Sequence, residues 1–98
     1  MFVRIVKMSF DKDLIDSFLN VFHLHKESIR NFPGCRFLEL YQDKDNPSIF
    51  FTYSYWNDEA DLENYRTSEL FKNVWSKTKT LFNDKPQAWS VDKIVSLK

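Results

Sequence analysis

A tyrosine, a tryptophan and several cations are the residues of this chain whose types could do chemistry. The phenol of Tyr65 can donate a hydrogen bond to the oxygen of a bound quinone or enolate. The indole of Trp75 can form a flat wall against which an aromatic ligand stacks. Arg4, Lys7 and Lys79 lie on mainly apolar segments, where a charge needs a partner or an anionic ligand unless it reaches the surface. The structural alternative is that both rings are core residues and all three cations extend into solvent.

Histidine and cysteine chemistry is limited in this sequence. His25 lies on the apolar stripe of a predicted helix, either as a general base for a phenol proton or as a neutral histidine bonded to a backbone carbonyl. His23 is only two residues away, so the two imidazoles do not face one metal ion. Cys35 is the only cysteine, which excludes an intrachain disulfide and a cysteine-based zinc site. We therefore expect neither a metal nor another cofactor.

Composition narrows the possible classes of protein. The chain has 98 residues, enough for one domain over residues 1–98, with 14 basic and 14 acidic side chains. This balance argues against nucleic acid as a partner. No basic block indicates a membrane surface, and no apolar run approaches the ~20 residues of a membrane span. Charged side chains interrupt the first apolar run, so no signal peptide is predicted and we expect a cytoplasmic protein.

The candidate residues concentrate in residues 50–90, which contain all three tryptophans and three of the four tyrosines. Hydrophobic periodicity and turn residues predict the elements that position them. The predicted elements are a strand over 2–10, a helix from an Asp11 cap to about Asn31, a hairpin of strands 35–42 and 48–56, a helical region capped at Asn57 and recapped at Ser68, and a strand over 88–97. This β-α-β-β-α-β order is the ferredoxin-like α+β arrangement, an antiparallel four-stranded sheet with helices on one face.

The third predicted strand is aromatic or apolar on both of its sides. Phe50 and Trp56 fall on one side, and Phe51, Tyr53 and Tyr55 fall on the other. A sheet with one face in water should instead alternate with polar residues. Since the helices cover only one face, the sequence predicts a homodimer in which the sheet of a second copy covers the other.

Five short segments of the chain resemble the antibiotic biosynthesis monooxygenase family, the dimeric α+β barrels, and the resemblance extends over the whole chain. These segments are FPGC at 32–35, FTYSYW at 51–56, LENYR at 62–66, SELF at 68–71 and KPQAWS at 85–90. The resemblance implies the same fold and a homodimer. The family includes quinol and anthrone oxygenases, which work without a cofactor, and haem-degrading enzymes.

The resemblance also implies roles for particular positions. In the cofactor-independent oxygenases, an aromatic residue matches Tyr65 and an asparagine one turn earlier matches Asp61. A tyrosine about six residues further on matches Phe71, and a later cation matches Lys85. In the haem-degrading relatives, the histidine that binds iron matches Trp75, which cannot bind iron. The resemblance therefore implies a monooxygenase and disfavours haem degradation.

The leading hypothesis is a cofactor-independent monooxygenase acting on a small quinol-like or anthrone-like substrate. Tyr65, His25 and Lys79 are its candidate catalytic residues. The candidate residues for binding the substrate are Trp75, Phe71, Asp61, Lys85 and Arg4. The alternative is a homodimer that binds a small hydrophobic molecule without catalysis, which the departures at Asp61 and Phe71 favour.

Overall fold

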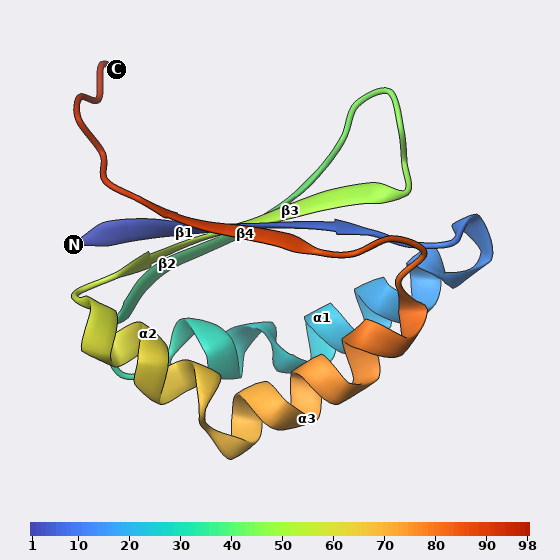
Figure 1. Ribbon diagram of the computed structural model, residues 1–98, viewed down its shortest axis with the longest axis horizontal. Helices are drawn as coiled ribbons and strands as arrows, with labels where there is room; N and C mark the ends of the chain where they lie inside the picture. Colours follow the sequence, from blue (N-terminus) through green and yellow to red (C-terminus); the bar gives the residue numbers. More distant parts are fainter.

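Four antiparallel strands form one sheet in the order β2-β3-β1-β4, and all helices lie on the same face of it (Figure 1). The computed structural model describes residues 1–98. The strands are β1 (Phe2–Ser9), β2 (Cys35–Gln42), β3 (Ile49–Trp56) and β4 (Gln87–Val91). The helices are α1 (Ile15–Arg30), α2 (Glu59–Arg66) and α3 (Glu69–Thr78), with 3₁₀ turns η1 (Lys12–Leu14) and η2 (Lys79–Leu81). The predicted ferredoxin-like α+β fold is confirmed.

The helix starts differ from the sequence predictions in two places. Asp11 precedes the turn η1, and its side chain makes no capping hydrogen bond; α1 starts only at Ile15. Asp58, rather than Asn57, caps α2 by accepting a hydrogen bond from the backbone N–H of Asp61. Asn57 instead accepts a hydrogen bond from Nε of Arg36 at 2.9 Å. Adjacent Asn and Asp are equally good caps, so a local pattern could not choose between them.

The last strand is shorter than the predicted strand over 88–97. β4 pairs only with β1, from Gln87 opposite Lys7 to Val91 opposite Val3. Because β1 begins at Phe2, almost no strand backbone remains for β4 to pair with after Val91. The segment after Val91 therefore leaves the sheet on the side away from the helices, where Lys93 lies 4.7 Å from the ring centre of Tyr55 (Figure 1).

The core between the sheet and the helices is divided into two clusters of buried residues. One is formed by Phe2, Cys35, Trp56 and Leu62, with Phe32 and Tyr65 packed against it. The other is formed by Met8, Phe10, Phe18 and Phe50, with seven partly buried apolar side chains around it. On the helix-facing side of β3, Thr52 and Ser54 lie between Phe50 and Trp56. These small side chains leave the middle of β3 without large residues on this face.

The opposite face of the sheet has no helix over it (Figure 1). Its rows are mostly apolar and include two packed ring pairs, Phe37 with Tyr55 and Tyr41 with Tyr53, whose ring centres lie 4.4 and 5.1 Å apart. Trp89 on β4 is 43% exposed. The uncovered side of β3 is thus aromatic or apolar along its whole length, as predicted, whereas the helix-facing side has Thr52 and Ser54 between Phe50 and Trp56. No helix in the structure has the length and apolar character that crossing a membrane requires.

Candidate functional site

A cavity of about 310 Å³ lies between the two core clusters. Its floor is the helix-facing side of the sheet, where Arg4 is opposite Ser54 on one neighbouring strand and Ser90 on the other. Its roof is formed by side chains of all three α-helices. Ala88 lines the cavity and is still exposed, because no helix covers this edge of the sheet. The cavity therefore opens beside β4.

A continuous series of aromatic rings forms one wall of the cavity. Tyr65 stacks on the fully buried Trp56 with ring centres 5.2 Å apart. Phe71 meets the edge of Tyr65 at 5.2 Å and stacks on Trp75 at 5.7 Å, with an interplanar angle of 13°. Trp75 in turn contacts Phe82 of the second cluster at 5.4 Å. Such a wall is complementary to a flat ligand, since offset stacking and edge contacts between rings are favourable.

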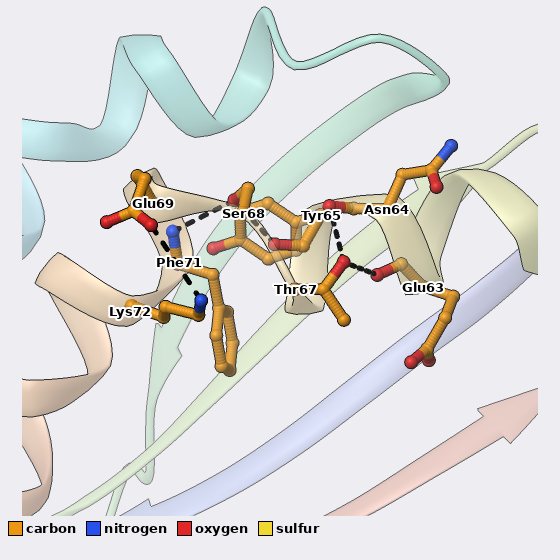
Figure 2. Close-up of polar contacts among 8 residues, drawn as sticks. All are labelled: Glu63, Asn64, Tyr65, Thr67, Ser68, Glu69, Phe71 and Lys72. Atoms are coloured by element: carbon orange, nitrogen blue, oxygen red, sulfur yellow. Dashed lines mark hydrogen bonds and ion pairs between the residues drawn. The ribbon is translucent and has the colours of Figure 1, made fainter.

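The corner between α2 and α3 fixes the first two rings of this wall (Figure 2). The hydroxyl of Ser68 donates a hydrogen bond to the backbone oxygen of Tyr65 at 2.6 Å and accepts one from the backbone N–H of Phe71 at 3.1 Å. Thr67 closes the end of α2 by donating its hydroxyl proton to the backbone oxygens of Glu63 and Asn64. The predicted second cap at Ser68 is confirmed, and it connects the backbones of two cavity residues.

The phenol of Tyr65 is the polar group on the deeper part of this wall. No hydrogen bond within the chain involves its hydroxyl, and the hydroxyl is not among the fully buried atoms. Burial, and to a smaller extent the nearby Cys35, raise the pKa of Tyr65 above its ordinary value. At neutral pH the side chain is therefore a protonated phenol, able to donate a hydrogen bond and unsuited to accept a proton.

Two arginines give the cavity its charge. Arg4 lies on the floor, half-buried, and its Nη1 donates a hydrogen bond to Oγ of Ser90 at 2.9 Å. Arg66, at the end of α2, also lines the cavity. Burial, and then the positive charge of Arg66, lower the pKa of Arg4. No aspartate, glutamate, histidine or cysteine lines the cavity, so its charge is positive.

The structure brings together four of the eight residues that the sequence singled out. Tyr65, Phe71, Trp75 and Arg4 all line the cavity. Asp61, Lys79, Lys85 and His25 do not. Local features of the chain explain why these last four residues lie outside the cavity.

Asp61 lies against the turn that follows α1. Gly34 in that turn has φ +91°, and a Cβ atom there would collide with the side chain of Asp61. The close approach and the positive φ both require glycine. Asp61 therefore contacts the FPGC turn and does not face the cavity.

The two lysines are exposed. Lys79 lies directly after the last residue of α3, Thr78, at the start of η2, and its side chain does not line the cavity. Lys85 lies in the connection before β4 and is exposed.

His25 is half-buried on α1, and its Nε2 is buried without a hydrogen-bond partner. The sequence left open a neutral His25 bonded to a backbone carbonyl, and Nε2 makes no such hydrogen bond. Because His25 does not line the cavity, the geometry gives no support to its role as a base.

Sequence reasoning missed Arg66, the polar floor residues Thr52 and Ser54, and Ser90, which does not line the cavity but bonds Arg4. The alternation of β3 gave a usable signal for Thr52 and Ser54, because these small polar residues occupy positions that should face the helices. No local signal marked Arg66, an ordinary helix-terminal cation in the sequence. Its position beside Arg4 depends on how α2 packs over the sheet.

Similarity to solved structures defines the class of fold. A crystal structure of an antibiotic biosynthesis monooxygenase superposes with a TM-score of 0.90 at 21% identity, covering 97% of this chain and 100% of that one. A conserved protein from Methanosarcina mazei Go1 gives 0.88 at 22% identity, covering 95% and 93%. The Mycobacterium tuberculosis protein Rv0793 gives 0.88 at 14% identity, covering 99% and 98%. At these identities the likeness establishes the fold alone.

The sequence itself establishes the family. The profile of the family described as antibiotic biosynthesis monooxygenase matches residues 1–75, about three quarters of the chain. The chain therefore belongs to the antibiotic biosynthesis monooxygenase family. No curated protein matches it significantly in sequence.

Proposed function

We propose that the protein is a monooxygenase that oxidises a small aromatic substrate, such as a quinol or an anthrone, with dioxygen and without a cofactor. The observation that carries the proposal is the cavity wall of Tyr65, Phe71 and Trp75, which presents a free phenol beside two rings. Membership of the monooxygenase family supports the same reaction class. A volume of about 310 Å³ suits a small ligand, at the low end of the ~300–1,000 Å³ typical of such sites.

The reaction balances with dioxygen as the only oxidant. Loss of a proton from the substrate gives a carbanion, which passes one electron to dioxygen. The resulting radical and superoxide combine into a peroxide anion, which takes up a proton from water to give the hydroperoxide. Loss of water from the H–C–O–OH unit then breaks the O–O bond and leaves a carbonyl. A CH₂ carbon is oxidised by four electrons, and O₂ is reduced by four: one oxygen atom enters the product and the other leaves as water.

Each contribution of the protein corresponds to a feature of the cavity. The rings of Phe71 and Trp75 hold the substrate flat and displace water from it. Tyr65 donates a hydrogen bond to the substrate oxygen on which negative charge develops. Arg4 favours the ionised substrate, since a nearby opposite charge lowers the pKa of an acid by ~1–3 units. Because no carboxylate or histidine lines the cavity, the substrate proton passes to water at the open edge beside β4.

Oxygen uptake by the purified protein tests the proposal. We expect uptake with anthrone or 1,4-dihydroxynaphthalene that exceeds autoxidation and is proportional to protein concentration. Tyr65→Phe should reduce kcat about 100- to 1000-fold, because one donor to a developing oxyanion is removed. Tyr41→Phe, which removes a hydroxyl that is bonded to Glu39 on the opposite face of the sheet, is the control for loss of a tyrosine hydroxyl outside the cavity. Equal rates for Tyr65→Phe and the wild type would contradict the assigned role.

A second candidate function is binding of a small aromatic molecule without catalysis. The specific observation in its favour is the lack of any carboxylate or histidine in the cavity, which leaves no side chain there to accept a proton. It predicts that naphthalene-type ligands quench tryptophan fluorescence while no tested substrate consumes oxygen.

We also propose that the protein is a homodimer in which the bare faces of two sheets pack together. The apolar rows of that face, with Trp89 43% and Tyr41 45% exposed, support an obligate type of interface. Only Lys7 and Glu39 place charges in these rows. A paired sheet would bury the aromatic residues that no helix covers.

A further inference from the structure

The distribution of charge around the cavity is unusual for a site that takes a neutral aromatic ligand. Both charged side chains that line it, Arg4 and Arg66, are positive. The chain as a whole has 14 basic and 14 acidic residues, so this imbalance is local. Twelve of the 19 lining residues are hydrophobic. The cavity thus combines an apolar body with two guanidinium groups.

Neither arginine is neutralised inside the cavity. Arg4 takes part in no salt bridge, and its hydrogen bond goes to the neutral hydroxyl of Ser90. Arg66 has Glu63 at 3.6 Å, but those two side chains are 49% and 65% exposed and Glu63 does not line the cavity. An exposed pair of this kind is weak. Two like charges on a partly apolar surface are costly when a protein leaves them without an anion.

The two arginines also act on each other. The charge of Arg66 contributes to the lowered pKa of Arg4, which places the two groups within electrostatic reach. This repulsion is present in the resting protein, before any substrate has ionised. An anion that forms only during turnover leaves the repulsion uncompensated for most of the cycle. A ligand with a permanent negative charge removes it on binding.

We propose that the natural ligand of the cavity is an aromatic carboxylate, whose carboxylate group binds Arg4 and Arg66 while its ring lies against Phe71 and Trp75. Guanidinium groups match the planar carboxylate through paired N–H donors, which gives orientation as well as affinity. Ser90, already bonded to Arg4, holds that guanidinium in place on the floor. The proposal deepens the proposed function by naming the substrate class of the same cavity, and it makes Arg66 a specificity residue.

The binding test compares an acid with its uncharged analogue. We expect 2-naphthoate to bind at least about tenfold more tightly than 2-naphthamide in calorimetric titrations, because charge-assisted hydrogen bonds replace neutral ones. Arg66→Gln should lose about tenfold in affinity for the acid and less than about twofold for the amide. Arg4→Gln should lose affinity for the acid and for the amide by the same factors. Arg36→Gln, an equal charge change on a residue that bonds Asn57 outside the cavity, is the matched control.

A salt titration of the wild type repeats the test without a substitution that could disturb folding. Affinity for 2-naphthoate should fall as sodium chloride rises, and affinity for 2-naphthamide should not. The proposal is overturned if acid and amide bind equally, if neither binds, or if Arg66→Gln leaves the affinity for the acid unchanged.

Oxygen uptake separates this proposal from the function on which it rests. The substrates are 1,4-dihydroxynaphthalene and its 2-carboxylate. Faster uptake with the carboxylate, lost in Arg66→Gln, supports both proposals. Equal turnover of the two compounds by wild type and Arg66→Gln overturns the carboxylate proposal and leaves the oxygenase intact. Tight, arginine-dependent binding of 2-naphthoate, with no uptake from either quinol, supports the ligand class and overturns the oxygenase.

Discussion

Tyr65 combines two properties that determine its chemistry: its ring is packed between Trp56 and Phe71, and its hydroxyl has no partner in the chain. Desolvation disfavours the charged phenolate, so the raised pKa keeps the proton in place at neutral pH. A residue of this type can stabilise an oxyanion by donation. It cannot supply the base that the substrate needs, and the cavity contains no other candidate base.

The raised pKa of Tyr65 predicts a change in stability at alkaline pH. Below pH ~10 the tyrosine is protonated in both states and contributes no pH dependence. As the pH rises further, the unfolded chain loses this proton before the folded protein does. The free energy of unfolding should therefore fall by up to about 1.4 kcal/mol per pH unit from this group.

Urea unfolding between pH 8 and pH ~11 measures this effect. The free energy of unfolding of the wild type should decrease more steeply with pH than that of Tyr65→Phe. If the Tyr65→Phe and wild-type curves run parallel, the phenol is not desolvated in solution.

For single residues, reasoning from the sequence succeeded where the chemistry depends on residue type. It failed where the chemistry depends on packing between segments that are far apart in the chain. Phe71 and Trp75 share one surface of α3, and Tyr65 lies just before the cap residue Ser68, so helical spacing and a local cap signal could predict that the three lie together. Lys79, a candidate catalytic residue in the sequence, follows the end of α3 and does not line the cavity. Arg66 and Arg4 come to line the same cavity only through the packing of α2 over the sheet, and no local pattern in the sequence indicates that arrangement.

The corner between α2 and α3 is the element that carries the aromatic wall. Its geometry depends on one hydroxyl, since Ser68 bonds the backbone of both Tyr65 and Phe71 (Figure 2). Sequence reasoning could place this corner because its signal is local: a cap residue between two short apolar stripes. The predicted end of the last strand was wrong, because β4 ends where its pairing with β1, a strand far away in the chain, ends.

Ser68→Ala should therefore affect both stability and ligand binding. Loss of the cap should lower the free energy of unfolding by about 1 kcal/mol. The affinity for 2-naphthoate should also decrease, because the rings of Tyr65 and Phe71 lose their common anchor. Urea unfolding and calorimetric titration measure the two effects.

Ser76→Ala is the control within the same helix, because Ser76 is exposed and its hydroxyl bonds only the preceding turn of α3. It should change the affinity little. A Ser68→Ala variant that is destabilised but binds the acid as tightly as the wild type would show that the cap does not organise the cavity.

For the whole molecule, the sheet separates two surfaces with different tasks. One face supports the cavity, and the other presents aromatic rows without cover (Figure 1). We expect Ile5→Glu, which lies between Tyr53 and Trp89 in the middle of those rows, to shift the protein from dimer to monomer in light scattering coupled to size exclusion, since burying a charge among aromatic rings is strongly disfavoured.

Asn73→Glu is the matched control, because it adds the same charge to the exposed surface of α3. It should leave the assembly unchanged. A wild type that elutes as a monomer at all concentrations would refute the sheet-to-sheet dimer, whatever the behaviour of the variants.

The divided core links the occupancy of the cavity to the heat resistance of the protein. Two apolar clusters hold the fold at either end, and the space between them has few contacts of its own. A bound molecule supplies the missing packing, and a ligand at 100 times its dissociation constant stabilises the folded state by about 2.7 kcal/mol. Melting temperature thus becomes a reporter that requires no turnover. A library of aromatic acids ranked by the rise in Tm would lead to the natural ligand before its chemistry is known.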